Sequence, residues 1–143
     1  ERHATFDVHK KKRSSEHEAF LNIQRVIAEY MKALAELADD ELVSFDKSVD
    51  SLTEGLKGLN ALNDSEIQAF GSITKLLTRA MTDGYRQRQL KFIITESNSH
   101  LQILISRQKE LVLTYIDNLS AEKTSIGSYY GDTVVNSFYH KVV

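Results

Sequence analysis

Apolar side chains recur along the first part of the chain at alternating steps of three and four residues. They form two runs separated by a shift in phase: Phe20, Ile23, Ile27, Tyr30, Leu34 and Leu37, then Leu42, Phe45, Val49, Leu52, Leu56 and Leu59. Such spacing gives an α-helix one continuous apolar stripe. A stripe of this length has to be buried against other helices, so the pattern predicts an all-α protein with coiled-coil-like packing.

The first helix is predicted over residues 15–58. Ser15 and Glu18 have the spacing of a capping box, which satisfies two backbone N–H groups at a helix start. Residues 1–13 have no apolar period and are predicted to be an extended or loosely ordered lead-in. The phase shift at residues 38–41 is interpreted as a stutter within one helix, and a break at Asp39 is the alternative.

A second helix is predicted over residues 64–95. Gly55 and Gly58 weaken the end of the first helix, and Asn63 or Asp64 is expected to cap the second. A helix that follows a short loop runs antiparallel to the one before it, so the two are expected to form a hairpin that turns near residue 61.

A third helix is predicted over residues 99–124, because the polar stretch 95–99 has the composition of a turn. That stretch contains neither Gly nor Pro, so one very long helix is the alternative. Residues 125–143 are expected to form a docking tail with a short fourth helix after Asp132. The result is one antiparallel bundle domain, residues 1–143, of three long helices and above about 70 per cent helix.

The predicted core takes residues from all three helices. The third helix has a wide apolar face, because a row of Ile105, Val112 and Leu119 runs beside Leu104, Leu111 and Tyr115. A face of that width suits contact with more than one neighbour. The residues expected to be buried are Phe45, Val49, Leu52, Ile73, Leu77, Leu104, Leu111 and Tyr115.

Composition narrows the chemistry that the chain can support. Among its 143 residues there is no Cys, which excludes disulfides, thiolate zinc sites and thiol nucleophiles, and no Pro, which fits long helices with short loops. None of the five His residues has a Glu three positions before it, as a di-iron bundle requires. Gly-x-Ser-x-Gly and phosphate-binding glycine loops are also missing. We therefore expect no enzymatic activity, no cofactor and no metal.

Charge is distributed unevenly along the chain. Residues 36–54 hold seven acidic residues and one basic residue, whereas residues 61–95 hold five basic and three acidic residues. In a hairpin whose facing positions sum to about 122, Asp46 is expected beside Lys75, Glu41 or Asp40 beside Arg79, and Glu36 beside Arg86. Exposed pairs contribute only about 0–1 kcal/mol each, so this pattern supports the register more than the stability.

The length of the first helix indicates an interaction surface. It spans about 66 Å at 1.5 Å per residue, longer than either predicted partner helix. Part of its stripe is therefore expected to be exposed unless another chain covers it. The expected interaction residues are Phe20, Leu21, Ile23 and Ile27.

A basic run, Lys10, Lys11, Lys12 and Arg13, is a second candidate for interaction. Each basic residue near an anionic membrane contributes roughly 1 kcal/mol, so peripheral membrane contact through this run is compatible with the sequence. The formal net charge of −2 argues against a dedicated nucleic-acid binder.

Two functional hypotheses fit these features. The first is a non-enzymatic protein–protein interaction or scaffold module that binds a protein partner or a second copy of itself. The alternative is an extracytoplasmic ligand-sensing bundle of a membrane-anchored protein, in which the basic run follows a membrane segment. Transmembrane helices flanking this segment in the full-length gene would distinguish the second hypothesis from the first.

Overall fold

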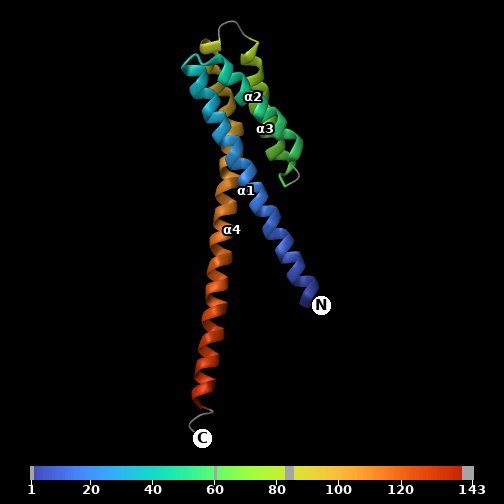
Figure 1. Ribbon diagram of the computed structural model, residues 1–143, viewed down its shortest axis with the longest axis vertical. Coiled ribbons are helices and arrows are strands. Elements are labelled where there is room, and N and C mark those ends of the chain that lie inside the picture. Colours follow the sequence, from blue (N-terminus) through green and yellow to red (C-terminus); the bar gives the residue numbers. More distant parts are fainter. Residues whose placement is uncertain (1, 60, 83–85, 140–143) are drawn as a thin grey trace. The chain divides into compact units, whose positions relative to one another are not determined.

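The computed structural model describes residues 2–59, 61–82 and 86–139. Within these ranges there are four α-helices, two short 3-10 helices and no strand, which confirms the all-α prediction (Figure 1). The chain divides into two units, residues 1–108 and residues 109–143, and each is described by itself. The prediction of one domain over the whole chain stays a prediction.

Helix α1 runs from Arg2 to Ala38, so the predicted lead-in over residues 1–13 and the predicted start at Ser15 are wrong. The first twelve residues of α1 contain neither Pro nor Gly. Once a helix is nucleated, each added residue gains one backbone hydrogen bond and needs no apolar stripe to do so. An i,i+4 ion pair, Lys12 Nζ to Glu16 Oε1 at 3.8 Å, adds a small contribution.

A sharp break separates α1 from α2, Leu42–Gly55, so the prediction of one helix over 15–58 is wrong and its alternative is right. Asp40 has φ 60° in the left-handed region, which Asp tolerates better than most residues. The Glu41 N–H donates to the Glu36 carbonyl at 2.8 Å and the Asp40 N–H to the Leu37 carbonyl at 3.4 Å. This pair of bonds is a Schellman motif, which ends α1.

Helix α2 packs against the last turns of α1, and one polar contact lies between them. The buried Ser48 hydroxyl donates to Glu36 Oε2 at 2.7 Å. Glu36 also lies 3.9 Å from Lys32 Nζ on its own helix. The expected partner Arg86 has no described side chain. The pairs Asp46–Lys75 and Glu41–Arg79 stay predictions.

The hairpin near residue 61 is confirmed. A 3-10 turn, Leu56–Gly58, follows α2, and α3, Asp64–Met81, returns beside α2 (Figure 1). Asn63 caps α3 in a full capping box with Glu66, and it is one of the two caps that the sequence predicted. The helix ends at Met81 rather than at residue 95, so the predicted length of the second helix is wrong.

Helix α4 runs from Leu90 to Tyr139 after a 3-10 turn, Arg86–Gln89. The predicted turn at residues 95–99, the predicted end at 124 and the separate tail over 125–143 are therefore wrong. The alternative of one helix over residues 64–124 is also wrong, because α3 ends at Met81 and α4 begins at Leu90. A Ser or Thr inside a helix can donate to the carbonyl four residues earlier, so these polar side chains are hydrogen-bonded without a turn. Such bonds run from Thr95, Ser97, Thr124, Ser125, Ser128 and Thr133.

Each helix of unit 1 contributes one line of buried side chains to the core. On α1 the buried line has steps of four and three residues: Ala19, Ile23, Val26, Tyr30, Ala33 and Leu37. Of the predicted core, seven residues are buried: Phe45, Val49, Leu52, Ile73, Leu77, Leu104 and Leu111. Tyr115 is 64% exposed, so its predicted burial is wrong.

Candidate interaction surface

The structure separates the four apolar residues of α1 that were expected to interact. Ile23 is fully buried inside unit 1, so its expected exposure is wrong. Phe20 and Ile27 are part-buried and Leu21 is 49% exposed. Helix α2 packs on α1, and the start of α4 contacts α1 at Tyr30. More of the apolar stripe of α1 is therefore covered within unit 1 than the sequence predicted. Only Leu21 remains open to a partner.

The basic run lies on α1 and is exposed from Lys10 to Arg13. These side chains point to different sides of the helix, because successive residues are about 100° apart. Peripheral membrane contact through this run stays a prediction. In the part of the chain that the structure describes, no helix is long and apolar enough to cross a membrane.

A buried carboxylate in unit 1 has a structural explanation. Glu66 Oε1 accepts a hydrogen bond from Asn63 Nδ2 at 2.8 Å and lies 3.0 Å from Arg107 Nε, while its Oε2 accepts from the Asn63 N–H. The Glu66 side chain is 3% exposed. A buried charge needs an opposite charge and hydrogen bonds, and this carboxylate has both. Glu66 therefore fixes the start of α3 to α4.

Among the described residues, no group of three or more His, Asp or Glu side chains is placed to hold a metal ion. Tyr30 and Ser97 form a second buried polar contact, again between two helices of unit 1. The Glu66–Arg107 contact and the Tyr30–Ser97 contact each join two helices, so these buried polar side chains have a structural role.

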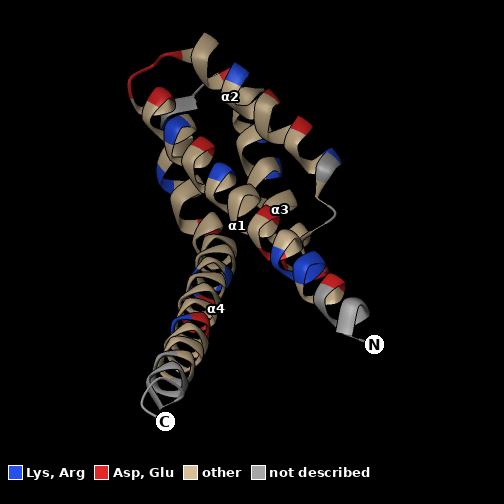
Figure 2. Cartoon of the chain, turned by 60° about the horizontal axis from the view of Figure 1, so that its bottom comes forward, with Lys and Arg blue, Asp and Glu red and all other residues tan. Residues whose placement is uncertain are grey.

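The open feature of the molecule is the apolar side of α4 in unit 2. Seven large side chains there are 40–70% exposed: Val112, Tyr115, Ile116, Leu119, Ile126, Tyr129 and Tyr130. At 100° per residue they lie within about 140° of arc, so they form one surface. We call these seven residues the unit 2 face. Figure 2 shows the described part of unit 2 mostly tan, with few charged residues.

The unit 2 face is large for a monomeric protein. A large apolar or aromatic side chain covers roughly 150–250 Å² when fully exposed, so the seven together expose on the order of 800 Å². Monomeric proteins rarely expose an apolar patch larger than about 300–600 Å². A patch above that range is typical of a contact surface.

The spacing along the unit 2 face is that of a helix that contacts another helix. Val112, Leu119 and Ile126 are seven residues apart, and Ile116 and Tyr130 each follow one of them by four residues. This three-four spacing is the coiled-coil pattern. Tyr129 and Tyr130 pack edge to face, with ring centroids 6.0 Å apart and an interplanar angle of 83°.

Sequence reasoning found the first part of this surface and missed the rest. The row through Val112 and Leu119 was expected to contact more than one neighbour. Its continuation through Ile126 to Tyr130 was assigned to the separate tail over residues 125–143. The seven-residue step from Leu119 to Ile126 was the signal that the helix continues.

Comparison with known proteins gives no significant match to a family model, to a curated protein or to a solved structure.

Proposed function

We propose that this chain is a non-enzymatic protein–protein interaction or scaffold module that self-associates through the unit 2 face. The observation that carries the proposal is the exposure of seven large side chains on one side of α4, each between 40% and 70% exposed. Removing such apolar surface from water is the dominant favourable term in most protein association.

The size of the face suits a specific interface. A standard protein–protein interface buries about 800 Å² on each partner, which is the order of the area that the unit 2 face exposes. Aromatic residues are enriched at the centres of interfaces, and three of the seven residues are tyrosines. A rigid helix also loses little conformational freedom on binding.

Unit 1 supplies the base for this surface. The Schellman motif at Asp40 ends α1, the capping box at Asn63 begins α3, and the contact between Glu66 and Arg107 joins α3 to α4, all without residues of the unit 2 face. The proposed scaffold therefore has separate residues for folding and for binding.

The extracytoplasmic ligand-sensing hypothesis stays a prediction. Its support would come from transmembrane helices on both sides of this segment in the full-length gene.

Paired substitutions within the unit 2 face test the proposal. Ile116→Glu with Leu119→Glu places two charges at the centre of the face, where burial of an unpaired charge is strongly unfavourable. We expect size-exclusion chromatography with light scattering to show the wild type as an assembly and this variant as a monomer of 16.3 kDa. Circular dichroism of the variant checks that the helices are retained.

Val43→Glu is the matched control, because Val43 is an apolar residue of α2 that is 71% exposed and lies in unit 1. It should leave the assembly unchanged. Equal masses for the wild type and the double variant, or dissociation caused equally by Val43→Glu, would contradict the proposal.

A further inference from the structure

We propose that two copies of this chain pair through the unit 2 face in parallel and in register, with Lys123 of each copy beside Glu122 of the other. This inference rests on the proposed function and names the partner and its orientation. It follows from the positions of charged residues along the three-four pattern of α4.

The pattern assigns core positions to particular residues. Val112, Leu119 and Ile126 occupy one core position of the seven-residue repeat, and the other core position, four residues later, falls on Lys109, Ile116, Lys123 and Tyr130. Two lysines therefore lie in a line that is otherwise apolar. A lysine at such a position specifies the arrangement of the helices and lowers the stability of the pair.

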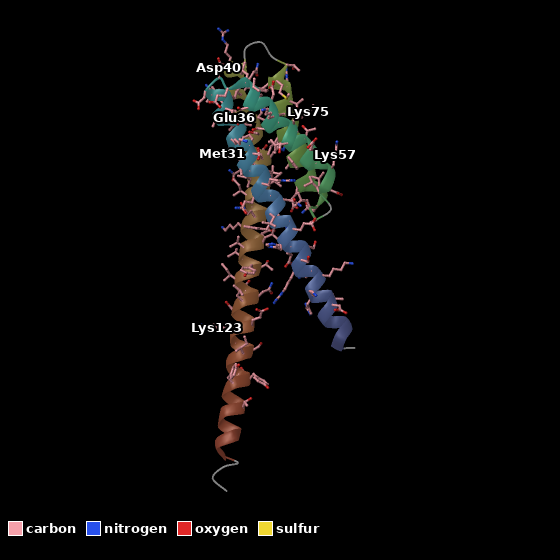
Figure 3. All side chains as sticks on the ribbon, in the orientation of Figure 1. Met31, Glu36, Asp40, Lys57, Lys75 and Lys123 are labelled. Atoms are coloured by element: carbon pink, nitrogen blue, oxygen red, sulfur yellow. The ribbon has the colours of Figure 1, made fainter. Side chains whose placement is uncertain are left out.

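The residue before Lys123 can offset part of that effect. Lys123 follows Glu122, a half-buried residue on the edge of the same face (Figure 3 labels Lys123). In a parallel pair, a core side chain enters a hole formed by four residues of the facing helix. For Lys123 these are residues 119, 122, 123 and 126 of the second copy, which include an acidic residue.

An antiparallel pair over the same residues gives a less favourable set of neighbours. The hole for Lys123 is then formed by residues 109, 112, 113 and 116 of the second copy. That set contains Lys109 and no acidic residue. Each orientation places one lysine of the second copy beside Lys123, and only the parallel hole also contains a glutamate, Glu122. Charge complementarity therefore favours the parallel orientation.

The exposed area also favours a second copy as the occupant. The unit 2 face exposes on the order of 800 Å², about the area that each partner of a standard interface buries. A parallel pair related by a two-fold axis uses the same face on both chains and leaves neither face open.

Disulfide cross-linking of single-cysteine variants tests the orientation, and the natural chain contains no Cys that would interfere. Lys109→Cys and Ile126→Cys are made separately and oxidised, alone and as an equimolar mixture. A disulfide forms readily when the Cα atoms are about 4.4–6.8 Å apart. In the parallel pair each variant links to itself. In the antiparallel pair described above residue 109 lies opposite residue 126, so only the mixture would link.

The outcomes separate the two proposals. Self-linking of both variants to a mass of two chains supports the parallel pair. Linking only in the mixture, or an assembly of three or more chains, would overturn the parallel pair and leave the proposed function standing. A monomer without any cross-link would overturn both.

A charge exchange gives a second readout that does not depend on disulfide geometry. Lys123→Glu is expected to raise the dissociation constant of the pair at least about tenfold, because it places acidic residues of the two copies side by side in the interface. Glu122→Lys combined with Lys123→Glu should restore it to within about threefold. Asp117→Lys, a charge change on the opposite side of α4, is the matched control and should have little effect. Failure of the double exchange to restore association would overturn the pairing.

Discussion

The hydroxyl groups of Tyr30 and Ser97 lie 2.6 Å apart inside unit 1, although the two residues are 67 positions apart in the chain. The Ser97 hydroxyl donates its one proton to the Ile93 carbonyl at 2.6 Å, so the Tyr30 hydroxyl is the donor between the pair. Ser97 is fully buried and Tyr30 is 2% exposed. The bond therefore joins α1 to α4 where water cannot replace it.

The two hydroxyl groups should contribute unequally to stability. Tyr30→Phe removes the donor and leaves Ser97 bonded to Ile93, so we expect a loss of about 1 kcal/mol. Ser97→Ala leaves the Tyr30 hydroxyl buried without its partner, and we expect a loss of about 2 kcal/mol. Urea denaturation measures both. A larger loss for Tyr30→Phe than for Ser97→Ala would contradict this assignment of donor and acceptor.

Glu66→Ala should destabilise the protein by about 2–3 kcal/mol. It removes the capping box of α3 and leaves the Arg107 guanidinium, which is 35% exposed, without its buried carboxylate. Urea denaturation is again the measurement. Glu54→Ala, at an exposed glutamate of α2, is the control and should change stability by less than about 0.5 kcal/mol. Equal effects from the two substitutions would show that Glu66 does not fix α3 to α4.

Leu77→Ala should cost roughly 2–5 kcal/mol, because Leu77 is fully buried on α3 and the change leaves a cavity. Leu21→Ala, at a leucine of α1 that is 49% exposed, should cost less than half as much. Denaturation in urea compares the two variants with the wild type. A neutral Leu77→Ala would mean that α3 is rotated from its described orientation.

Gly71→Ala should stabilise the protein by about 0.5–1 kcal/mol. Gly71 lies inside α3, and a Cβ atom added there meets no atom within 4 Å. Alanine also reduces the conformational freedom of the unfolded chain. Gly55→Ala gives the contrast, because its Cβ would lie 2.9 Å from Arg25 Nη2. Thermal unfolding should give Gly71→Ala a higher Tm than the wild type and than Gly55→Ala. The reverse order of Tm values would contradict the packing described at Gly55.

Periodicity predicted the existence of helices much better than it predicted their ends. The hairpin and a cap at Asn63 or Asp64 followed from a short loop and from residue types that favour helix starts, which are local signals. The break at Asp40 did not, because it depends on one residue adopting a left-handed conformation while α2 packs back on α1. A stutter and a break give the same sequence pattern, and tertiary packing decides between them.

Ser97 shows why the expected turn at residues 95–99 was wrong. Five consecutive polar residues have the composition of a loop, yet the helix continues through them. The hydroxyls of Thr95 and Ser97 donate to carbonyls of the same helix, and Ser97 also meets Tyr30. No local rule indicates a partner 67 residues away. The same error hid the full length of the unit 2 face, since a helix ended at residue 124 leaves out Ile126, Tyr129 and Tyr130.

The dependence of mass on concentration tests self-association through the unit 2 face most directly. Sedimentation equilibrium of the wild-type chain follows its weight-average mass from about 1 to 100 µM, a range that spans micromolar affinities. We expect a mass that rises above 16.3 kDa with concentration and approaches twice that value. We expect Ile116→Glu with Leu119→Glu to remain at 16.3 kDa throughout. A wild-type chain that stays at the monomer mass over the whole range would contradict the account.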